Sequence, residues 1–340
     1  MVNLDITQDR LHLGERLSVS FQRTLRIPDD GRTYPLPPGL GAFPIYRVAD
    51  FVDRVPPTWR EHGGVFIPMY QREALWLAFH AAAWKPNAVK VAVGRVNAIS
   101  GAPEEARLHA DPQDYVVCPE QLWLDGIHTG QNAIRQFVAM PLGLGYSVEA
   151  SVTGTEQFGG IQITVFEPHP GKFPEEPPVR PASDSAGPVR LAGLRAGSSA
   201  AQTMGLGAGG VMRQKIYPDP YGLDTWDQDN YVEVFVYILN SAQFFAVTGL
   251  EAPATPIDAK VYTDYGLPWF VLYDESAGDV PLSERLTQVK TIAERDAERG
   301  EPTEGEVSFE VSAEQTKTLR RDDSGTARGS SSSSETTEHV

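Results

Sequence analysis

An alternation of apolar and polar side chains with a period of two is the feature that most constrains how this chain can fold. Successive side chains of a β-strand point to opposite faces of a sheet, so the alternation predicts strands with one buried face. It is clearest in the segments 17–21, 89–93, 146–153 and 161–165. The run 232–239 is apolar at almost every position, which is typical of a central strand covered on both faces.

Further segments bring the expected total to about nine strands. We expect strands where apolar and β-branched residues gather, at 115–118, 134–140, 211–216 and 243–247. The segments 146–153 and 161–166 are joined by a glycine-containing stretch, so they are interpreted as an antiparallel hairpin with a long loop.

Two segments carry a helical period instead. In the segment 71–84, Leu75 and Phe79 stand four residues apart, and the pattern ends just before a proline. The segment 282–299 places apolar residues on one side and charged residues on the other. Many strands with few helices predict a mainly β (α+β) fold. We expect an antiparallel β-sandwich or barrel-like body with one packed helix and a C-terminal helix, followed by a disordered tail.

Composition divides the chain into four parts. Residues 1–166 form a β-rich lobe, and residues 167–203 are rich in proline, glycine and serine, which predicts a linker or long loop. A second β-rich lobe covers 204–300, and its glycine-rich start at 204–210 is interpreted as a flexible entry turn, because no helix follows to form a dinucleotide loop. Residues 301–340 are acidic and serine-rich, which predicts a disordered tail.

The charge balance argues against two classes of partner. The chain has 45 acidic and 29 basic residues, a formal net charge of −16. Such a surface repels nucleic-acid phosphates and anionic lipids, so we expect neither nucleic acid nor membrane as a partner. The single cysteine, Cys118, rules out a disulfide framework, and the N-terminus lacks the pattern of a signal peptide. We therefore expect a soluble, cytoplasmic protein.

A polar cluster around His109 is the first candidate site. His109 and Asp111 precede the expected strand 115–118, and Asp125 and His128 follow it. Imidazole and carboxylate groups could together hold zinc or a similar transition metal, with His109, Asp111 and His128 as the ligands. The alternative is an ordinary Asp-Pro turn before a strand, because the spacing matches no metal-binding signature.

A second cluster holds the aspartates of residues 219–230, namely Asp219, Asp224, Asp227 and Asp229. Several carboxylates near a glycine could wrap calcium, which prefers oxygen ligands. The alternative is a loop whose aspartates form Asx turns, since the EF-hand pattern is absent. The cofactor stays unknown at this point, with a divalent metal, calcium or zinc, as the candidate.

Aromatic residues in proline- and glycine-rich segments are the third candidate, represented by Tyr221, Trp226, Tyr265 and Trp269. Tyrosine and tryptophan suit interfaces because one end of the ring tolerates water. The leading hypothesis is a non-enzymatic binding or assembly protein that uses these residues to contact a protein partner or small ligand. The alternatives are a metal-dependent enzyme or metal-stabilised β domain, and a small-ligand-binding β-barrel.

Overall fold

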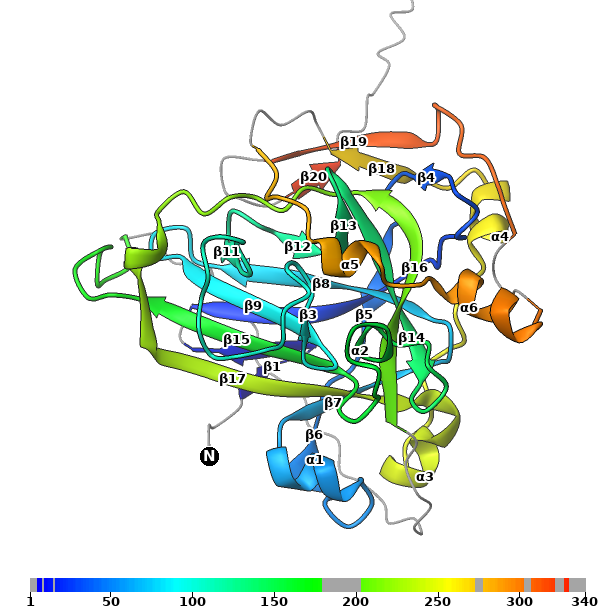
Figure 1. Cartoon of the computed structure of the whole chain (residues 1–340), viewed down its shortest axis with the longest axis horizontal. Coiled ribbons are helices and arrows are strands. Elements are labelled where there is room, and N and C mark those ends of the chain that lie inside the picture. The colour runs from blue at the N-terminus through cyan, green and yellow to red at the C-terminus, as the bar shows by residue number, and fades with distance from the viewer. Residues whose placement is uncertain are drawn as a thin grey trace, which may run out of the picture.

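The body of the protein is one mainly antiparallel β-sheet that folds over on itself without closing, as in a β-sandwich (Figure 1). The structure is a computed structural model and describes residues 5–7, 9–14, 16–178, 203–272, 278–302, 307–321 and 327–329. The expected fold class, mainly β with few helices, is confirmed.

A continuous antiparallel ladder forms the frame of this sheet. In order of pairing its strands are β1 (Asp5–Thr7), β2 (Arg10–Leu13), β3 (Leu17–Thr24), β8 (Ala74–Ala81), β14 (Ala133–Pro141), β16 (Thr203–Arg213), β17 (Trp226–Asn240), β15 (Ile161–Pro168) and β9 (Asn87–Val93). Since β16 and β17 lie between β14 and β15 in this order, the two halves of the chain share one sheet. The long run expected at 232–239 is indeed a central strand.

Shorter strands extend the ladder, and three more form a separate sheet. The short strands of the main sheet are β4 (Thr33–Tyr34), β5 (Gly39–Ala42), β6 (Tyr46–Arg47), β7 (Val65–Met69), β10 (Val96–Asn97), β11 (Val116–Cys118), β12 (Trp123–Leu124) and β13 (Gly126–Gly130). Of these, β4 and β7 run parallel to β16 and β17. The small sheet consists of β18 (Trp269–Leu272), β19 (Thr316–Arg321) and β20 (Ala327–Gly329).

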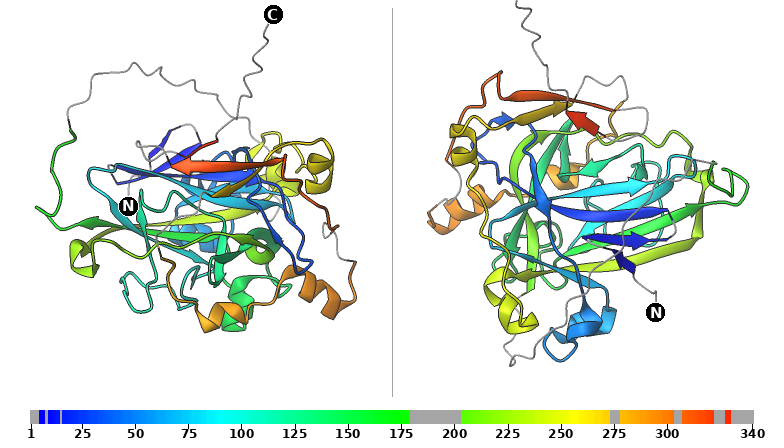
Figure 2. Two further views of the ribbon diagram at one scale, coloured as in Figure 1. Left: turned by 90° about the horizontal axis from the view of Figure 1, so that it is seen from above. Right: turned by 180° about the vertical axis from the view of Figure 1, so that it is seen from behind.

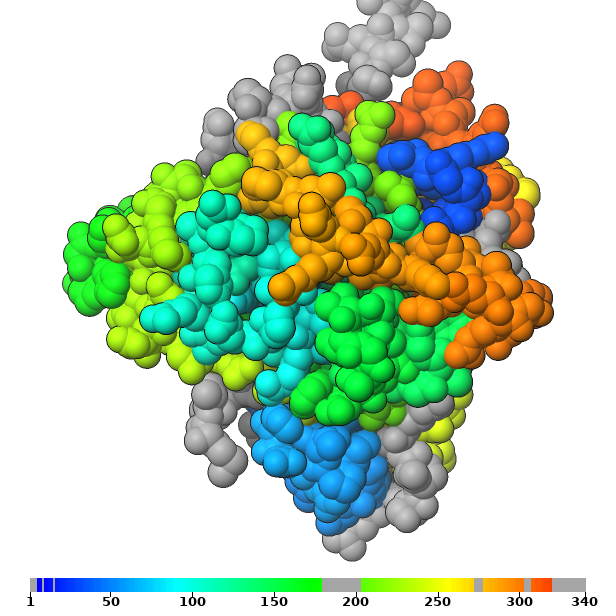
Figure 3. Space-filling view, viewed as in Figure 1, coloured from blue at the N-terminus to red at the C-terminus, as the bar shows by residue number. Residues whose placement is uncertain are grey.

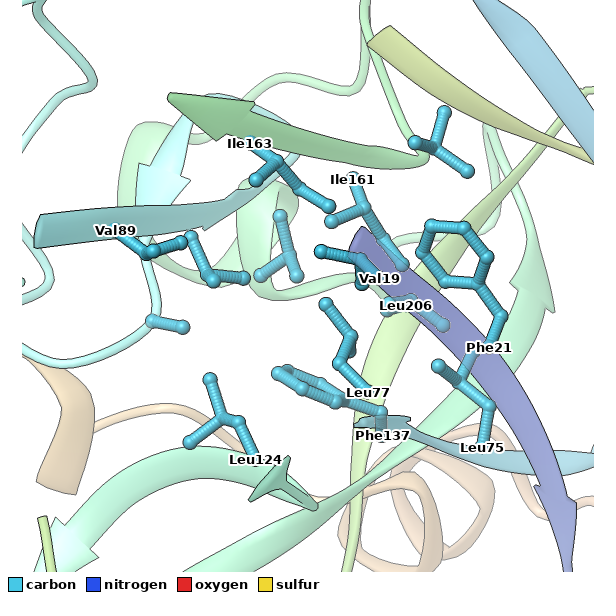
Figure 4. Close-up of a cluster of buried hydrophobic side chains, with 14 of the residues drawn as sticks. Val19, Phe21, Leu75, Leu77, Val89, Leu124, Phe137, Ile161, Ile163 and Leu206 are labelled. Atoms are coloured by element: carbon cyan, nitrogen blue, oxygen red, sulfur yellow. The ribbon is translucent and has the colours of Figure 1, made fainter. Parts of the chain in front are cut away.

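The main core lies between the two sides of the folded ladder (Figure 4). Val19 and Phe21 of β3 and Leu77 of β8 meet Ile161 and Ile163 of β15, and all five side chains are buried. Burying an aliphatic or phenylalanine side chain contributes roughly 1.5–3 kcal/mol. The alternation of the strands therefore supplies the main stabilisation of the fold.

The helices are short and lie at the periphery: α1 (Pro57–His62), α2 (Val148–Thr153), α3 (Phe244–Thr248), α4 (Ala259–Asp264), α5 (Glu284–Thr287) and α6 (Ile292–Arg299), with 3-10 turns η1 (Val48–Phe51), η2 (Leu223–Thr225) and η3 (Ser241–Gln243). The expected C-terminal helix 282–299 is present as α5 and α6, which cross the front of the molecule as one band (Figure 3). No helix within the described ranges is long and apolar enough to span a bilayer.

The helix expected at 71–84 is wrong, because this segment contains strand β8. Leu75, Leu77 and Phe79 all face the core, which is a period of two, and the spacing of four between Leu75 and Phe79 fits both periods. Strand β8 pairs with β3 along its whole length and with β12 and β14 on its other side. Pairing on both edges satisfies the backbone, and this tertiary context decides the outcome.

Two expected strands form helices instead. The segment 146–153 contains α2, so the hairpin expected with 161–166 does not exist. The side chain of Ser147 accepts a hydrogen bond from the backbone of Ala150, and Gly154 ends the helix in a left-handed conformation. The segment 243–247 lies in η3 and α3, after an Asn240 side-chain cap.

The glycine-rich run 204–210 is a buried strand, not a flexible turn, and it forms most of β16. Its glycines let neighbouring chains come close. A Cβ atom on Gly210 would lie 2.3 Å from the carbonyl oxygen of Pro28, and one on Gly207 would lie 2.8 Å from that of Tyr146. Close approach of the backbone is a common reason for glycine inside a strand.

The expected linker and tail are described in part. Residues 167–168 continue β15, and residues 179–202 lie outside the described residues, as do 303–306, 322–326 and 330–340 of the expected tail. Residues 307–321 pack on the body, which therefore extends beyond the boundary expected at 301. Phe309 joins a buried cluster with Trp269, and β19 pairs with β18. Figure 2 shows that this small sheet and the α5–α6 band lie on different sides of the body.

Candidate functional site

Strands β8 and β12, together with the residue that follows β12, present two tryptophans and a carboxyl group on one face of the main sheet. Leu77 and Leu124 are direct partners in the ladder, and both are buried in the main core. Because side chains alternate along a strand, Trp76, Trp123 and Asp125 face the opposite side. The same alternation that builds the core thus places these three groups together outside it.

A pocket of about 200 Å³ lies over this face. The segment 36–39 and the small sheet cover it, and Leu36 and Phe270 exchange backbone hydrogen bonds of 2.8 and 2.9 Å that join the cover together. Mostly apolar side chains form its walls, among them those of Pro37, Pro38, Trp76, Trp123, Phe270 and Leu319. Pockets with apolar walls and few polar groups are typical of small-ligand sites.

Asp125 is the polar group of this pocket. Only 4% of the residue is exposed, and burial raises the pKa of its carboxyl to about 7, although hydrogen bonds from Trp123 and Gln214 act in the opposite direction. The amide of Gln214 donates to Asp125 Oδ2 at 2.8 Å. Among the described residues that line the pocket, Asp125 carries the one ionisable side chain. Its carboxyl therefore exists in both protonation states near neutral pH.

A larger groove of about 860 Å³ adjoins the pocket, because Leu36 and Phe270 line both hollows. Its other walls include polar residues, among them Gln131 at the surface and the buried Gln214. Gln214 lines the groove and donates to the carboxyl of Asp125, which lines the pocket, so a hydrogen bond links the two hollows. A ligand seated in the pocket could extend into the groove.

The sequence pattern contains little that points to this site. Asp125 stands beside the expected metal ligands, and nothing in the pattern separates it from them. Trp76 falls in the segment expected to be helical, and a helical pattern gives the wrong direction for its side chain. A strand assignment for 74–81 would have placed Trp76 away from the core, and that is the one signal available.

The expected ligands His109, Asp111 and His128 have different surroundings. His109 is half exposed, with Nδ1 2.9 Å from Oδ2 of Asp114, and Asp111 is exposed on the same loop. His128 is fully buried on β13, with Nε2 3.5 Å from Oδ2 of Asp279. Within the described ranges, no three His, Cys, Asp or Glu side chains are grouped to hold a metal ion. The structure does not bring these three residues together as a metal site.

The calcium candidates make hydrogen bonds that suit a structural loop. The Asp219 carboxylate accepts hydrogen bonds from Tyr115 at 2.6 Å and from the Trp226 indole at 2.8 Å. Asp227 accepts from the backbone N–H of Asp229 at 3.1 Å, which forms an Asx turn, and Asp224 is exposed. These contacts, and the lack of a metal-type cluster in the described chain, support the turn alternative.

The four aromatic candidates divide into two pairs. Trp226 and Trp269 are 1% and 0% exposed, so they are core residues and not contact residues. Their indole N–H groups bond Asp219 and Thr263, which satisfies the polar end of each ring inside the protein. Tyr265 is 79% exposed, and Tyr221 is partly exposed with its ring edge on Trp226. Only the two tyrosines are placed to touch a partner.

Comparison with known proteins finds no relative of this chain. No family model, curated protein or solved structure matches the chain. The function is therefore argued from the pocket and the residues that form it.

Proposed function

We propose that this protein binds a small, largely apolar molecule in the pocket over β8 and β12, and that Asp125 holds a polar group of that molecule. The observation that carries the proposal is a buried carboxyl group in an otherwise apolar, aromatic pocket. Burying such a group is costly unless it is hydrogen-bonded, and a ligand with a donor group would add such a bond. Aromatic walls would supply most of the affinity.

This proposal keeps the idea of a binding protein on a β scaffold but moves the contact residues. The segment 36–39 comes largely from a proline-rich loop, whereas Trp76, Trp123 and Phe270 come from strands. A site built partly on strands holds its geometry better than one built on loops alone. The role that we propose is recognition, in which the Asp125 carboxyl orients a ligand against the apolar walls.

Nuclear magnetic resonance can test the proposal through the indole N–H signals. Indole, a neutral aromatic probe with one N–H donor, should shift the signals of Trp76 and Trp123 and leave that of Trp59 unchanged. Trp59 is a suitable reference because it is fully buried in a separate cluster. Leu319→Trp should place a larger side chain in the pocket and abolish the shifts, whereas Leu144→Trp, on an exposed loop, should not. Indole shifts that persist in Leu319→Trp would contradict the proposal.

A second candidate function, self-association, is favoured by three exposed, largely apolar side chains in and beside α4. Ile257, Val261 and Tyr265 are spaced by four residues and are 52%, 48% and 79% exposed. Lys260 and Asp264, which are also exposed, pair with each other beside these side chains. A second copy related by a two-fold axis could therefore cover the apolar side chains without leaving either charge unpaired. Sedimentation at increasing concentration tests this: Val261→Asp should remove any dimer, and a wild type that stays monomeric throughout would exclude it.

A further inference from the structure

The composition of the pocket over β8 and β12 restricts the chemistry of its ligand further than the proposed function does, and this restriction rests on that function. Three aromatic rings, those of Trp76, Trp123 and Phe270, line the same 200 Å³ as Asp125. Ring faces attract cations, and the attraction is stronger when both groups are desolvated. A carboxylate in the same low-dielectric space attracts the same charge.

We propose that this pocket takes the methylated ammonium group of a small organic cation, with the rings as its cage and Asp125 as its counter-ion. The side chains that hydrogen-bond the Asp125 carboxyl, Trp123 and Gln214, are both uncharged. An ionised carboxylate without a cationic partner is poorly tolerated at such burial, so a bound cation supplies the charge that its surroundings lack.

The small number of hydrogen-bond acceptors in the pocket walls favours methyl groups on this cation. A primary ammonium carries three N–H donors that each need an acceptor. Among the described lining residues, the only side-chain acceptor is the Asp125 carboxyl, which already accepts from Gln214. An unmethylated ammonium would depend on this one carboxyl and on main-chain carbonyls for its three donors, and each donor left without an acceptor would weaken binding. Methyl groups instead present apolar surface to the rings and to the side chains of Pro37 and Leu319.

The volume of the pocket and its connection to the adjoining groove agree with this ligand. An apolar cavity of about 150 Å³ is enough to hold benzene, so the present pocket has room for a trimethylammonium group and a short tail. The adjoining groove could receive the rest of a longer molecule, because Leu36 and Phe270 line both spaces. The expected ligand is therefore a free small molecule whose charged end enters first.

Affinity for such a cation should change with pH. Only the ionised form of Asp125 serves as counter-ion, and burial raises the pKa of this carboxyl to about 7 in the empty pocket. Binding of the cation should therefore release a proton below that pH. Affinity should be constant above about pH 8 and fall by up to about tenfold for each unit below pH 7.

Choline and its neutral isostere 3,3-dimethylbutan-1-ol test the inference directly, with calorimetry and the indole N–H signals as readouts. In the wild type at about pH 8, choline should bind at least about tenfold more tightly than the alcohol. Asp125→Asn should remove most of this difference, since its amide oxygen can still accept from Gln214. Asp224→Asn, on an exposed loop, is the matched control and should keep it.

The outcomes separate this inference from the proposed function. Equal affinity for choline and the alcohol in the wild type would overturn the cation preference and leave small-ligand binding intact. Indole binding without choline binding would do the same. If Asp125→Asn fails to fold, the pH dependence in the wild type decides, and choline affinity that is unchanged between about pH 6 and pH 8 overturns the inference.

Discussion

Asp125 and Gln214 hold each other through a reciprocal pair of hydrogen bonds. The Gln214 side-chain oxygen accepts from the backbone N–H of Asp125 at 3.1 Å, and its amide donates to the Asp125 carboxylate at 2.8 Å. The two residues are 89 positions apart in sequence, and both are buried. This pair fixes the position of the carboxyl that the proposed pocket uses.

Gln214→Ala should therefore destabilise the protein by about 1–3 kcal/mol, because it removes both bonds and leaves a buried carboxyl poorly satisfied. Chemical denaturation measures the change. Gln131→Ala is the matched control, since Gln131 lines the same groove but is exposed, and its effect should stay within about 0.5 kcal/mol. Equal effects of the two substitutions would contradict the structural role of the pair.

Asp125→Asn should stabilise the protein at high pH and have little effect at low pH. The pKa of Asp125 is raised in the folded state, from 3.8 to about 7, so the folded state binds the proton more tightly than the unfolded state. Stability consequently falls as pH rises from about 4 to 7, by a few kcal/mol for this one group. When thermal unfolding is measured between about pH 5 and pH 8, the variant should lack the part of the fall in stability with pH that Asp125 causes.

A smaller slope should remain in that variant because of Glu104. Burial, followed by the charge of Glu233, raises the pKa of Glu104 from 4.5 to about 7. Its contribution to stability therefore has the same sign as that of Asp125. An unchanged slope in Asp125→Asn would show that the Asp125 carboxyl is not buried in solution.

Gly210→Ala should destabilise the fold by about 1–3 kcal/mol or more, since the new Cβ atom would lie 2.3 Å from the carbonyl oxygen of Pro28. Gly278→Ala is the matched control. Its Cβ atom would meet only Pro218 Cγ, at 3.7 Å, which is an ordinary contact. Urea midpoints of the two variants compare them, and a neutral Gly210→Ala would contradict the close packing of β16.

Arg72→Ala should cost about 3–5 kcal/mol, because it removes one partner of a buried ion pair. The two terminal guanidinium nitrogens of Arg72 donate to Asp296 on α6 at 2.8 Å, and Tyr146 donates to the same carboxylate at 2.7 Å. An effect no larger than that of Lys290→Ala, which breaks a half-exposed pair, would contradict this role.

The same contacts make the packing of α6 on the body sensitive to acid. Burial alone would raise the pKa of Asp296, but the hydrogen bonds from Arg72 and Tyr146 outweigh it and hold the pKa below 3.8. A lowered pKa contributes stability that is present above the unfolded value and lost as pH falls through the folded value. Acid unfolding of the wild type should show this loss below about pH 4, and Arg72→Ala should reduce it.

Trp269→Ala and Tyr265→Ser distinguish core residues from contact residues. Trp269 is fully buried against Phe309 and Tyr262, so its loss should cost about 3–5 kcal/mol. Tyr265 is mostly exposed, so its replacement should change stability by less than about 0.5 kcal/mol. The midpoints of thermal unfolding measure both, and a stable Trp269→Ala variant would contradict its place in the core.

Much of the strand framework follows from local pattern, because alternation with a period of two reports which face of a strand is buried. The strands around Val19, Val91 and Ile163 were predictable for this reason. Short segments are different. Leu75 and Phe79 suit both a helix and a strand, and only pairing with β3 and β14 selects the strand. The glycines of β16 give no local sign of the neighbours that they accommodate.

By itself, the sequence determined that this chain is acidic and mainly β, because composition and alternation are properties of the residues and their immediate neighbours. The candidate site depends on contacts between distant segments. Asp125, Gln214 and Phe270 are ordinary residues in the sequence, and they form a site only where the small sheet covers β8 and β12. Tertiary structure decides both the burial of the Asp125 carboxyl and the identity of its neighbours. These two properties set its charge, so its chemistry is a product of the fold.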